Sequence, residues 1–174
     1  MKDNLAYAAS QNPVEMLRAV GAPDATPSEF MLDLKQGLAR QRKSISPKYF
    51  YDEAGSNLFD QICTLPEYYP TRTELSILQA HAKEIAVHLG PHAEILEFGA
   101  GSMQKVRVLL DAMDRPARYI PIDISAEHLQ VAALKMASDY PELQIEPLEA
   151  DYTQDVLLPP DLPPEGRRVG FFPG

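Results

Sequence analysis

Residues 93–101 read Ala-Glu-Ile-Leu-Glu-Phe-Gly-Ala-Gly, an apolar run that ends in two closely spaced glycines. The run over 93–98 has the length and composition of a buried β-strand. Glycines between a strand and a helix let a ligand approach the backbone, and the helix N-terminus offers free N–H groups. This pattern favours a nucleotide-like cofactor, and a plain strand–helix turn with incidental glycines stays open as the alternative. The helix is predicted from apolar residues at helical spacing: Val106, Leu109, Leu110 and Met113.

Acidic residues follow two further predicted strands. The run over 117–122 ends at Asp123, and the run over 143–148 leads to Asp151 and Tyr152. Open parallel α/β sheets bind ligands in the crevice outside these strand ends. We expect Asp123 to accept hydrogen bonds from both hydroxyls of a ribose, and Asp151 to hold an exocyclic amine. Taken singly, each acid is better explained as a loop carboxylate. Three strand-end acids in order, beginning with Glu97, favour a cofactor site.

The spacing of the glycines distinguishes two classes of cofactor. A nicotinamide dinucleotide site requires a third glycine where this chain has Gln104. S-adenosylmethionine needs no pyrophosphate cradle, and an acid at the end of the first strand can serve its ammonium group. Glu97 and Gly99 suit that case, so we expect S-adenosylmethionine as the cofactor.

Composition narrows the partners and the location. A formal net charge of −9 argues against a nucleic-acid substrate, because no basic stripe is present to neutralise phosphates. The lone Cys63 excludes an internal disulfide, and the four histidines lack the spacing of metal ligands. No apolar run reaches membrane-spanning length, and the first residues lack the pattern of a signal peptide. We expect a cytoplasmic protein with a small-molecule substrate and without metal, membrane or nucleic-acid partners.

The chain divides into three predicted segments. Residues 1–25 are weakly patterned, and residues 26–92 are helical and contain a tyrosine-rich stretch on the substrate side. Residues 93–174 are expected to form the first half of the S-adenosylmethionine-binding domain, which is incomplete in this chain. A first helix is predicted to start at Thr26-Pro27-Ser28-Glu29 and a second at Ser56. Two further helices are predicted to open near Pro70 and Ser125. In chain order, the apolar faces predicted for the four helices are Phe30, Leu34 and Leu38; Leu58, Phe59, Ile62 and Leu65; Leu75, Leu78, Ala82, Ile85 and Leu89; and Leu129, Ala132 and Met136.

A fourth strand is predicted over 167–172, close to the last residue of the chain. A doubly wound sheet needs strands on both sides of its switch point and helices on both faces. We therefore expect an α/β, Rossmann-like parallel sheet that is truncated after its fourth strand and preceded by a helical segment. The chain is expected to be the N-terminal part of a larger protein.

Five segments together resemble a known family: KYFYDEAGSNLFDQICTLPEYYPTRTE, EFGAGSMQK, PIDIS, ADY and FFPG. They are similar to the histidine Nα-methyltransferase of ergothioneine biosynthesis, over about 44–174. The first segment is the specific one, because few S-adenosylmethionine enzymes carry a tyrosine-rich stretch before the first strand. The resemblance implies a class I methyltransferase domain, a substrate-binding domain, and transfer of three methyl groups to the α-amine of L-histidine, which gives hercynine.

The resemblance also implies roles for single residues, without assigning a catalytic one. It implies five cofactor-binding positions: Gly99, Lys105, Asp123, Asp151 and Tyr152. It implies three positions near the histidine substrate: Tyr51, Tyr68 and Gly174. Gly174 corresponds to the first glycine of a G-S-x-I-G-N segment, and the family's other histidine-binding residues follow that segment. Met103 departs from the family, which has a small polar residue there.

The protein is expected to be a monomer at full length, and this chain by itself is expected to be inactive. Two alternatives stay open at this point. One is a methyltransferase for another small amine or acid, because the substrate-reading residues follow Gly174. The other is a non-catalytic nucleotide-binding module with the same glycine turn.

Overall fold

The computed structural model describes residues 28–161 and 166–173 of the chain. Two compact units divide at residue 49, one over 1–49 and the other over 50–174. The segment 1–25, Thr26, Pro27 and Gly174 lie outside the described residues. The segment boundaries expected at 25/26 and 92/93 stay predictions.

The first unit contains helix α2 (Glu29–Ala39). Ser28 caps this helix, since its side chain accepts a hydrogen bond of 3.3 Å from the backbone N–H of Met31. The capping residue is therefore Ser28, two residues later than the predicted start. The short 3₁₀ helix η1 (Pro47–Phe50) follows, and the hydroxyl of Tyr49 donates to Asp33 of α2 at 2.7 Å.

The apolar face predicted for α2 is largely exposed. Phe30 is 45% exposed and Leu38 is 47% exposed, while Leu34 is half-buried. Phe30 packs edge-on against the ring of Tyr49, with centroids 4.9 Å apart. A periodic apolar pattern marks one face of a helix, but burial requires a partner surface, which the described part of this unit does not supply for Leu38.

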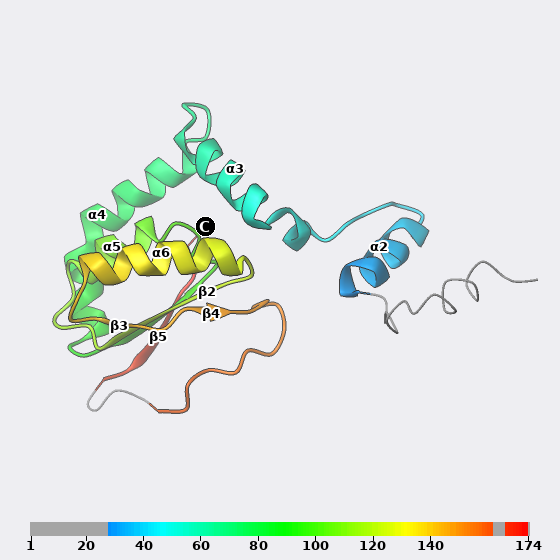
Figure 1. Cartoon of the computed structure of the whole chain (residues 1–174). Helices are drawn as coiled ribbons and strands as arrows, with labels where there is room; N and C mark the ends of the chain where they lie inside the picture. Colours follow the sequence, from blue (N-terminus) through cyan, green and yellow to red (C-terminus); the bar gives the residue numbers. More distant parts are fainter. Residues whose placement is uncertain (1–27, 162–165, 174) are drawn as a thin grey trace, which may run out of the picture. The chain divides into compact units, whose positions relative to one another are not determined.

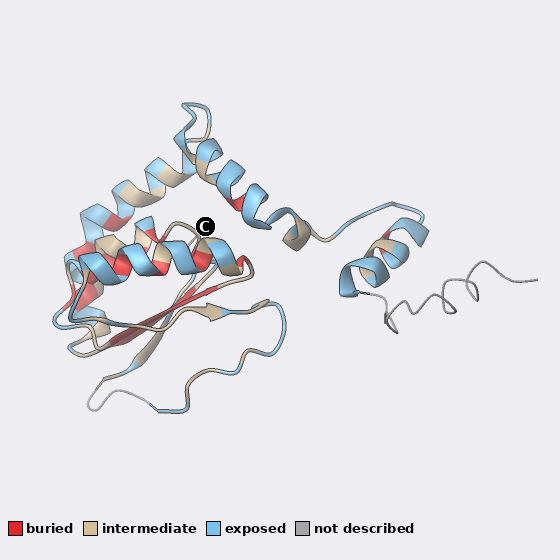
Figure 2. Cartoon of the chain, viewed as in Figure 1, coloured by how far each residue is buried: buried red, intermediate tan, exposed pale blue. Residues whose placement is uncertain are grey.

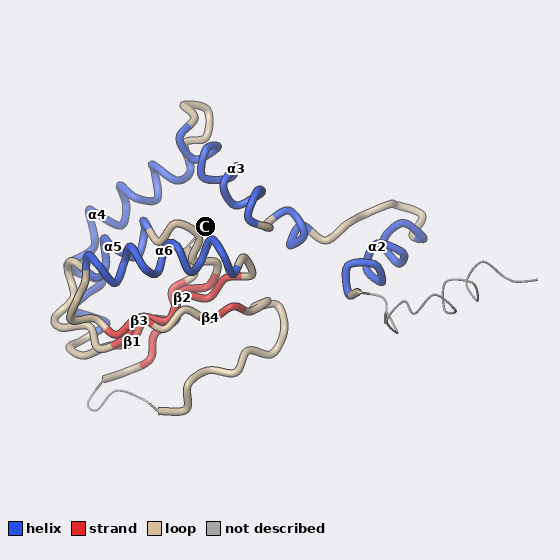
Figure 3. Tube along the Cα trace, in the orientation of Figure 1, coloured by secondary structure: helices blue, strands red, loops and turns tan. Residues whose placement is uncertain are grey.

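The second unit contains a parallel sheet in the strand order β3-β2-β1-β5, with β4 also paired to β2 (Figures 1 and 3). This arrangement confirms the expected parallel α/β architecture. Its elements are α3 (Glu53–Thr64), α4 (Pro70–Leu89), β1 (Glu94–Phe98), α5 (Gln104–Leu110), β2 (Arg118–Asp123), α6 (Ala126–Asp139), β3 (Gln144–Ile145), β4 (Leu148–Glu149) and β5 (Arg168–Phe171).

The predicted third strand forms as two short pieces, β3 and β4, with one register against β2. Tyr119 is opposite Ile145 before the gap, and Ile122 is opposite Leu148 after it. Pro121 and Pro147 fall between these pairs. Proline has no N–H to donate to a ladder, so the pairing is interrupted there while the register continues.

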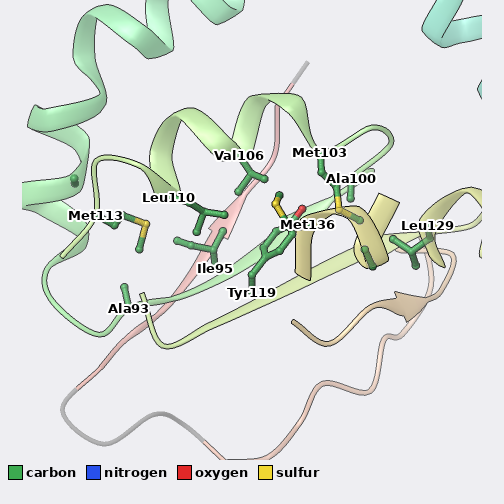
Figure 4. Close-up of a cluster of buried hydrophobic side chains, with 12 residues drawn as sticks. Ala93, Ile95, Ala100, Met103, Val106, Leu110, Met113, Tyr119, Leu129 and Met136 are labelled. Atoms are coloured by element: carbon green, nitrogen blue, oxygen red, sulfur yellow. The ribbon is translucent and has the colours of Figure 1, made fainter. Parts of the chain in front are cut away.

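One face of the sheet is covered by helices α4, α5 and α6 (Figure 1), and the main core lies between these layers (Figure 2). Figure 4 shows this cluster, in which the ring of Tyr119 lies among aliphatic and methionine side chains. The cluster contains five of the inward residues predicted after β1 and β2: Val106, Leu110, Met113, Leu129 and Met136. Of the face predicted for α4, only Leu89 packs against this cluster. Its fully buried members include Ile95, Val106, Tyr119, Leu129 and Met136.

The other face of the sheet is covered by an irregular segment over 150–161, which we call the strap. Apolar residues of the strap pack against a smaller core of Leu96, Ile120 and Ile122. Figure 1 shows the strap on the opposite side of the sheet from α6. The chain after β4 therefore runs back beneath the strands whose ends carry the candidate site.

Helix α3 exposes the face that its sequence predicts to be buried. Leu58, Phe59 and Ile62 are 58%, 36% and 41% exposed. The helix begins at Glu53 because Asp52 caps it, accepting a 2.8 Å hydrogen bond from the N–H of Gly55. Its contact with α6 is made instead by a polar side, where Asp60 lies 3.6 Å from His128.

Candidate functional site

The glycine turn after β1 is bound to β2 by backbone hydrogen bonds. The N–H groups of Gly99 and Ala100 both donate to the carbonyl of Ile122, at 2.9 and 3.1 Å. Gly99 has φ of +69° and Gly101 has φ of +49°, values that favour glycine. Met103 adopts φ of +57° just before α5 and is buried. The turn is thus a fixed surface, and Gly99 is exposed on it.

Asp123 lies at the end of β2 and accepts hydrogen bonds from two turns. Its Oδ2 accepts from the N–H of Gly101 at 3.0 Å, and its Oδ1 accepts from the N–H of Ser125 at 3.0 Å. A carboxylate oxygen has capacity for more than one hydrogen bond, so a ligand hydroxyl can still bind there. Asp123 therefore organises the glycine turn, and its role toward a ribose stays a prediction.

Asp151 and Tyr152 follow β4 and reach the same edge of the sheet. Asp151 Oδ1 accepts from the N–H and the hydroxyl of Thr153, at 3.0 and 2.5 Å. The hydroxyl of Tyr152 lies 3.6 Å from the position that a Cβ on Gly99 would take. Burial raises the pKa of Tyr152, and the neighbouring Asp123, Tyr51 and Asp151 raise it further. These contacts bring Tyr152 over the glycine turn.

Two aromatic residues that the sequence interpretation did not single out extend this surface. The ring of Tyr152 is edge-on to Phe98 at 6.1 Å and to Phe172 at 5.5 Å, and Phe98 and Phe172 are 6.0 Å apart. Phe98 ends β1 and Phe172 follows β5, the neighbouring strand. The parallel pairing of β1 and β5 brings the two rings together, and an aromatic residue at each strand end is the signal that could have indicated it.

Lys105 lies in the first turn of α5 and is paired with Glu74 of α4 at 2.5 Å. Both side chains are mostly buried, with 17% and 28% of their surface exposed. The ion pair between Lys105 and Glu74 therefore joins helices α5 and α4. Its expected contact with the cofactor stays a prediction.

The two tyrosines expected near the substrate lie on either side of Phe59. The Tyr51 ring is edge-on to Phe59 at 6.0 Å, and the Tyr68 ring is edge-on to Phe59 at 5.9 Å. Tyr51 also lies close enough to Tyr152 to raise its pKa. The structure thus brings the tyrosine-rich stretch toward the glycine turn. Gly174, the third expected substrate residue, lies outside the described residues.

Glu97 is buried in β1 with 1% of its surface exposed, although the sequence suggests a direct role toward the cofactor ammonium. The hydroxyl of Tyr119 donates a hydrogen bond to its Oε2. Burial raises the pKa of Glu97 to about 8, against the lowering effects of Tyr119 and Lys105. Glu97 therefore lies beneath the turn and has no open surface toward solvent.

Residues 28–161 and 166–173 contain neither a cluster of metal ligands nor a membrane-spanning helix. No group of three or more His, Cys, Asp or Glu side chains there is placed to hold a metal ion. None of the helices described in these ranges has the length and apolar composition needed to cross a membrane.

Comparison with known proteins identifies a family that the chain matches. The model of the family described as "Histidine-specific methyltransferase, SAM-dependent" matches residues 30–174. The chain belongs to this family. Membership confirms the resemblance stated from the sequence, and with the parallel sheet it confirms the class I methyltransferase fold.

Similarity to three named proteins agrees with this membership. The chain is 39% identical over 156 residues to histidine N-alpha-methyltransferase of Mycolicibacterium smegmatis, and this match covers 88% of this chain and 47% of that protein. It is 38% identical over 145 residues to the Mycobacterium tuberculosis protein of that name, and this match covers 82% of this chain and 44% of that protein. A match of 41% over 83 residues, 46% of this chain and 10% of the relative, is to ergothioneine biosynthesis protein 1 of Neurospora crassa. The chain spans about half the length of the two bacterial relatives.

Proposed function

We propose that this chain is part of an enzyme that transfers methyl groups from S-adenosylmethionine to the α-amine of L-histidine, in ergothioneine biosynthesis. The observation that supports it most is the family match over 30–174, which includes both the glycine turn and the tyrosine-rich stretch. Two relatives named for histidine methylation support the same substrate.

The residues at the strand ends fit the proposed cofactor. Gly99 presents an exposed backbone without a side chain, and Asp123 offers carboxylate oxygens held in place by two N–H groups. The proposed adenosine contacts are Asp123 for the ribose hydroxyls and Asp151 with Tyr152 for the base, with Gly99 and Lys105 completing the site. A bound S-adenosylmethionine would supply an electrophilic methyl group on a positively charged sulfur.

The rings of Tyr51, Phe59 and Tyr68 form a contiguous aromatic surface. Aromatic faces attract cations, and the product of three methyl transfers is a quaternary ammonium. We assign these residues to the wall beside the histidine amine. Their contribution to the reaction is orientation of the amine, which can supply roughly 7–11 kcal/mol of barrier lowering in well-oriented reactions.

The test is methylation of L-histidine by the intact protein that carries this chain. Mass spectrometry should detect mono-, di- and trimethylated histidine when S-adenosylmethionine is present. Turnover of another amine or acid, without turnover of histidine, would favour the alternative substrate. Calorimetric binding of NAD without binding of S-adenosylhomocysteine would contradict the methyltransferase proposal, and binding of neither would favour a non-catalytic module.

A variant pair tests the substrate wall. Replacing Tyr51 and Tyr68 together by Leu should raise the KM for histidine and leave S-adenosylhomocysteine affinity within about twofold, because the aromatic faces are lost while apolar packing against Phe59 is kept. Tyr69→Leu is the matched control, since Tyr69 is adjacent and 66% exposed. Equal losses of cofactor and substrate affinity in the double variant would contradict the assignment.

A further inference from the structure

Glu97, the strand-end acid that the sequence suggests for the cofactor ammonium, forms a buried polar pair with Tyr119. Glu97 of β1 and Tyr119 of β2 are 1% and 0% exposed, and the Tyr119 hydroxyl donates to Glu97 Oε2. Burying a carboxylate among apolar side chains is costly unless it is hydrogen-bonded or paired with a charge. The main core surrounds Tyr119 (Figure 4), so packing alone would be served equally well by phenylalanine at this position.

The charges around this pair come from three elements. Lys105 of α5 favours the ionised form of Glu97, whereas Asp123 of β2 and Glu74 of α4 oppose it. The positive charge of Arg107 in α5 lowers the pKa of Tyr119, against burial and Glu97, which raise it. Burial has the largest effect and raises the pKa of Glu97 to about 8, so the carboxyl group without a ligand is mostly protonated at pH 7.

Glu97 is two residues before Gly99, and its strand leads directly into the turn whose Gly101 N–H is held by Asp123. A positively charged ligand on this turn would favour the ionised carboxylate below it. A hydrogen bond from Tyr119 stabilises that ionised form and fixes its orientation.

We propose that Tyr119 is a positioning residue that holds the Glu97 carboxylate beneath the glycine turn, where the carboxylate stabilises the positive charge of the bound cofactor. This inference rests on the proposed function, because it takes S-adenosylmethionine as the ligand. Cofactor affinity then depends on the ionisation of Glu97, and Tyr119 sets the pH at which that ionisation occurs.

The test compares Tyr119→Phe with Tyr140→Phe in the intact protein. Each variant removes a hydroxyl that donates to a carboxylate, but the Tyr140 hydroxyl bonds to the exposed Asp111 at 2.6 Å, between α6 and the end of α5. Calorimetry from pH 6 to 9 gives the affinity for S-adenosylmethionine. The ratio to the wild-type protein at each pH cancels the titration of the ligand's own amine.

Tyr119→Phe should weaken S-adenosylmethionine binding about tenfold near pH 7, because a hydrogen bond to a charged group is lost. The loss should shrink at higher pH, since the pKa of Glu97 rises in the variant and ionisation needs a higher pH. Tyr140→Phe should follow the wild-type profile. A Tyr119→Phe protein that is folded and has the wild-type profile would overturn the inference.

Other outcomes separate this inference from the proposed function. If the wild-type protein binds no S-adenosylmethionine, the proposed function fails first. If Tyr119→Phe does not fold, Glu97→Gln replaces it, because glutamine keeps an acceptor for Tyr119 and cannot ionise. Glu97→Gln should weaken binding more at pH 9 than at pH 6, and a loss that is the same at both pH values would overturn the inference.

Discussion

Replacing Glu94 by Ala should destabilise the protein more than any exposed charge change, because Glu94 is the centre of a buried ionic cluster. Glu94 is 0% exposed, and the guanidinium groups of Arg118 and Arg168 donate to its two carboxylate oxygens. These arginines also donate to strap carbonyls, Arg118 to Asp161 at 2.5 Å and Arg168 to Pro159 at 2.7 Å. The cluster therefore joins three strands and the strap at the amino ends of the strands.

The magnitude follows from which partners remain. Removing one member of a buried ion pair costs about 3–5 kcal/mol, because the other charge is left uncompensated. Arg118 keeps Asp161 at 3.3 Å and Glu146 at 3.5 Å, so the lower end of that range applies. Burial alone would lower the pKa of Arg118, but Glu94, Glu146 and Asp161 raise it above its usual value, so the charge persists at neutral pH. With a denaturant slope of about 2 kcal/mol/M, a loss of about 3 kcal/mol moves the urea midpoint down by about 1.5 M.

Urea unfolding followed by circular dichroism measures this change at pH 7. Asp114→Ala is the control, because Asp114 pairs with Arg115 at 3.1 Å while both side chains are about two-thirds exposed or more. Such a surface pair contributes about 0–1 kcal/mol. Glu94→Gln should be intermediate, since it keeps an acceptor oxygen and removes the charge.

A Glu94→Ala protein that loses less than about 1 kcal/mol, with an unchanged denaturant slope, would refute this reasoning. That result would mean that water or the remaining acids compensate the two arginines. The buried position of Glu94 would then be a matter of packing only.

Three further outcomes follow from the site. Gly99→Ala should lower the free energy of unfolding by about 1–2 kcal/mol, because alanine is strained at the φ of +69° that Gly99 adopts. A Cβ there would meet Tyr152 only at ordinary contact distance, so the strain is in the backbone. S-adenosylhomocysteine binding should also weaken, and wild-type values in urea unfolding and calorimetry would contradict the prediction. Asp123→Ala should cost about 1–3 kcal/mol of S-adenosylhomocysteine affinity, since the N–H groups of Gly101 and Ser125 lose their acceptor along with the ligand; unchanged affinity by calorimetry would limit Asp123 to a strand-end carboxylate. Because folded Glu97 keeps its proton up to pH about 8 while the unfolded chain releases it near 4.5, stability should fall as pH rises between these values, and Glu97→Gln should flatten that slope in urea melts at pH 5 and 8.

Local patterns in the sequence were enough to predict the elements that position the site. The apolar run before Gly99, the helical spacing after it, and the acids at 123 and 151 depend only on neighbouring residues, and β1, α5 and β2 form where these patterns indicate. Helix α4 begins at Pro70 as predicted, because proline is favoured in the first turn. The family resemblance was also readable, since its specific segments are continuous in the chain.

Other features depend on residues far apart in the sequence, and only the tertiary structure decided them. The Tyr119 hydroxyl reaches Glu97 across 22 positions, and Glu94 meets Arg168 across 74, because parallel pairing places their strands side by side. Apolar periodicity indicated a face on α3, but no local pattern says whether another surface covers it, and Phe59 turned out to join two tyrosines instead. Periodicity reports what a segment can bury, whereas burial itself and the pKa of Glu97 depend on the neighbours that the whole fold supplies.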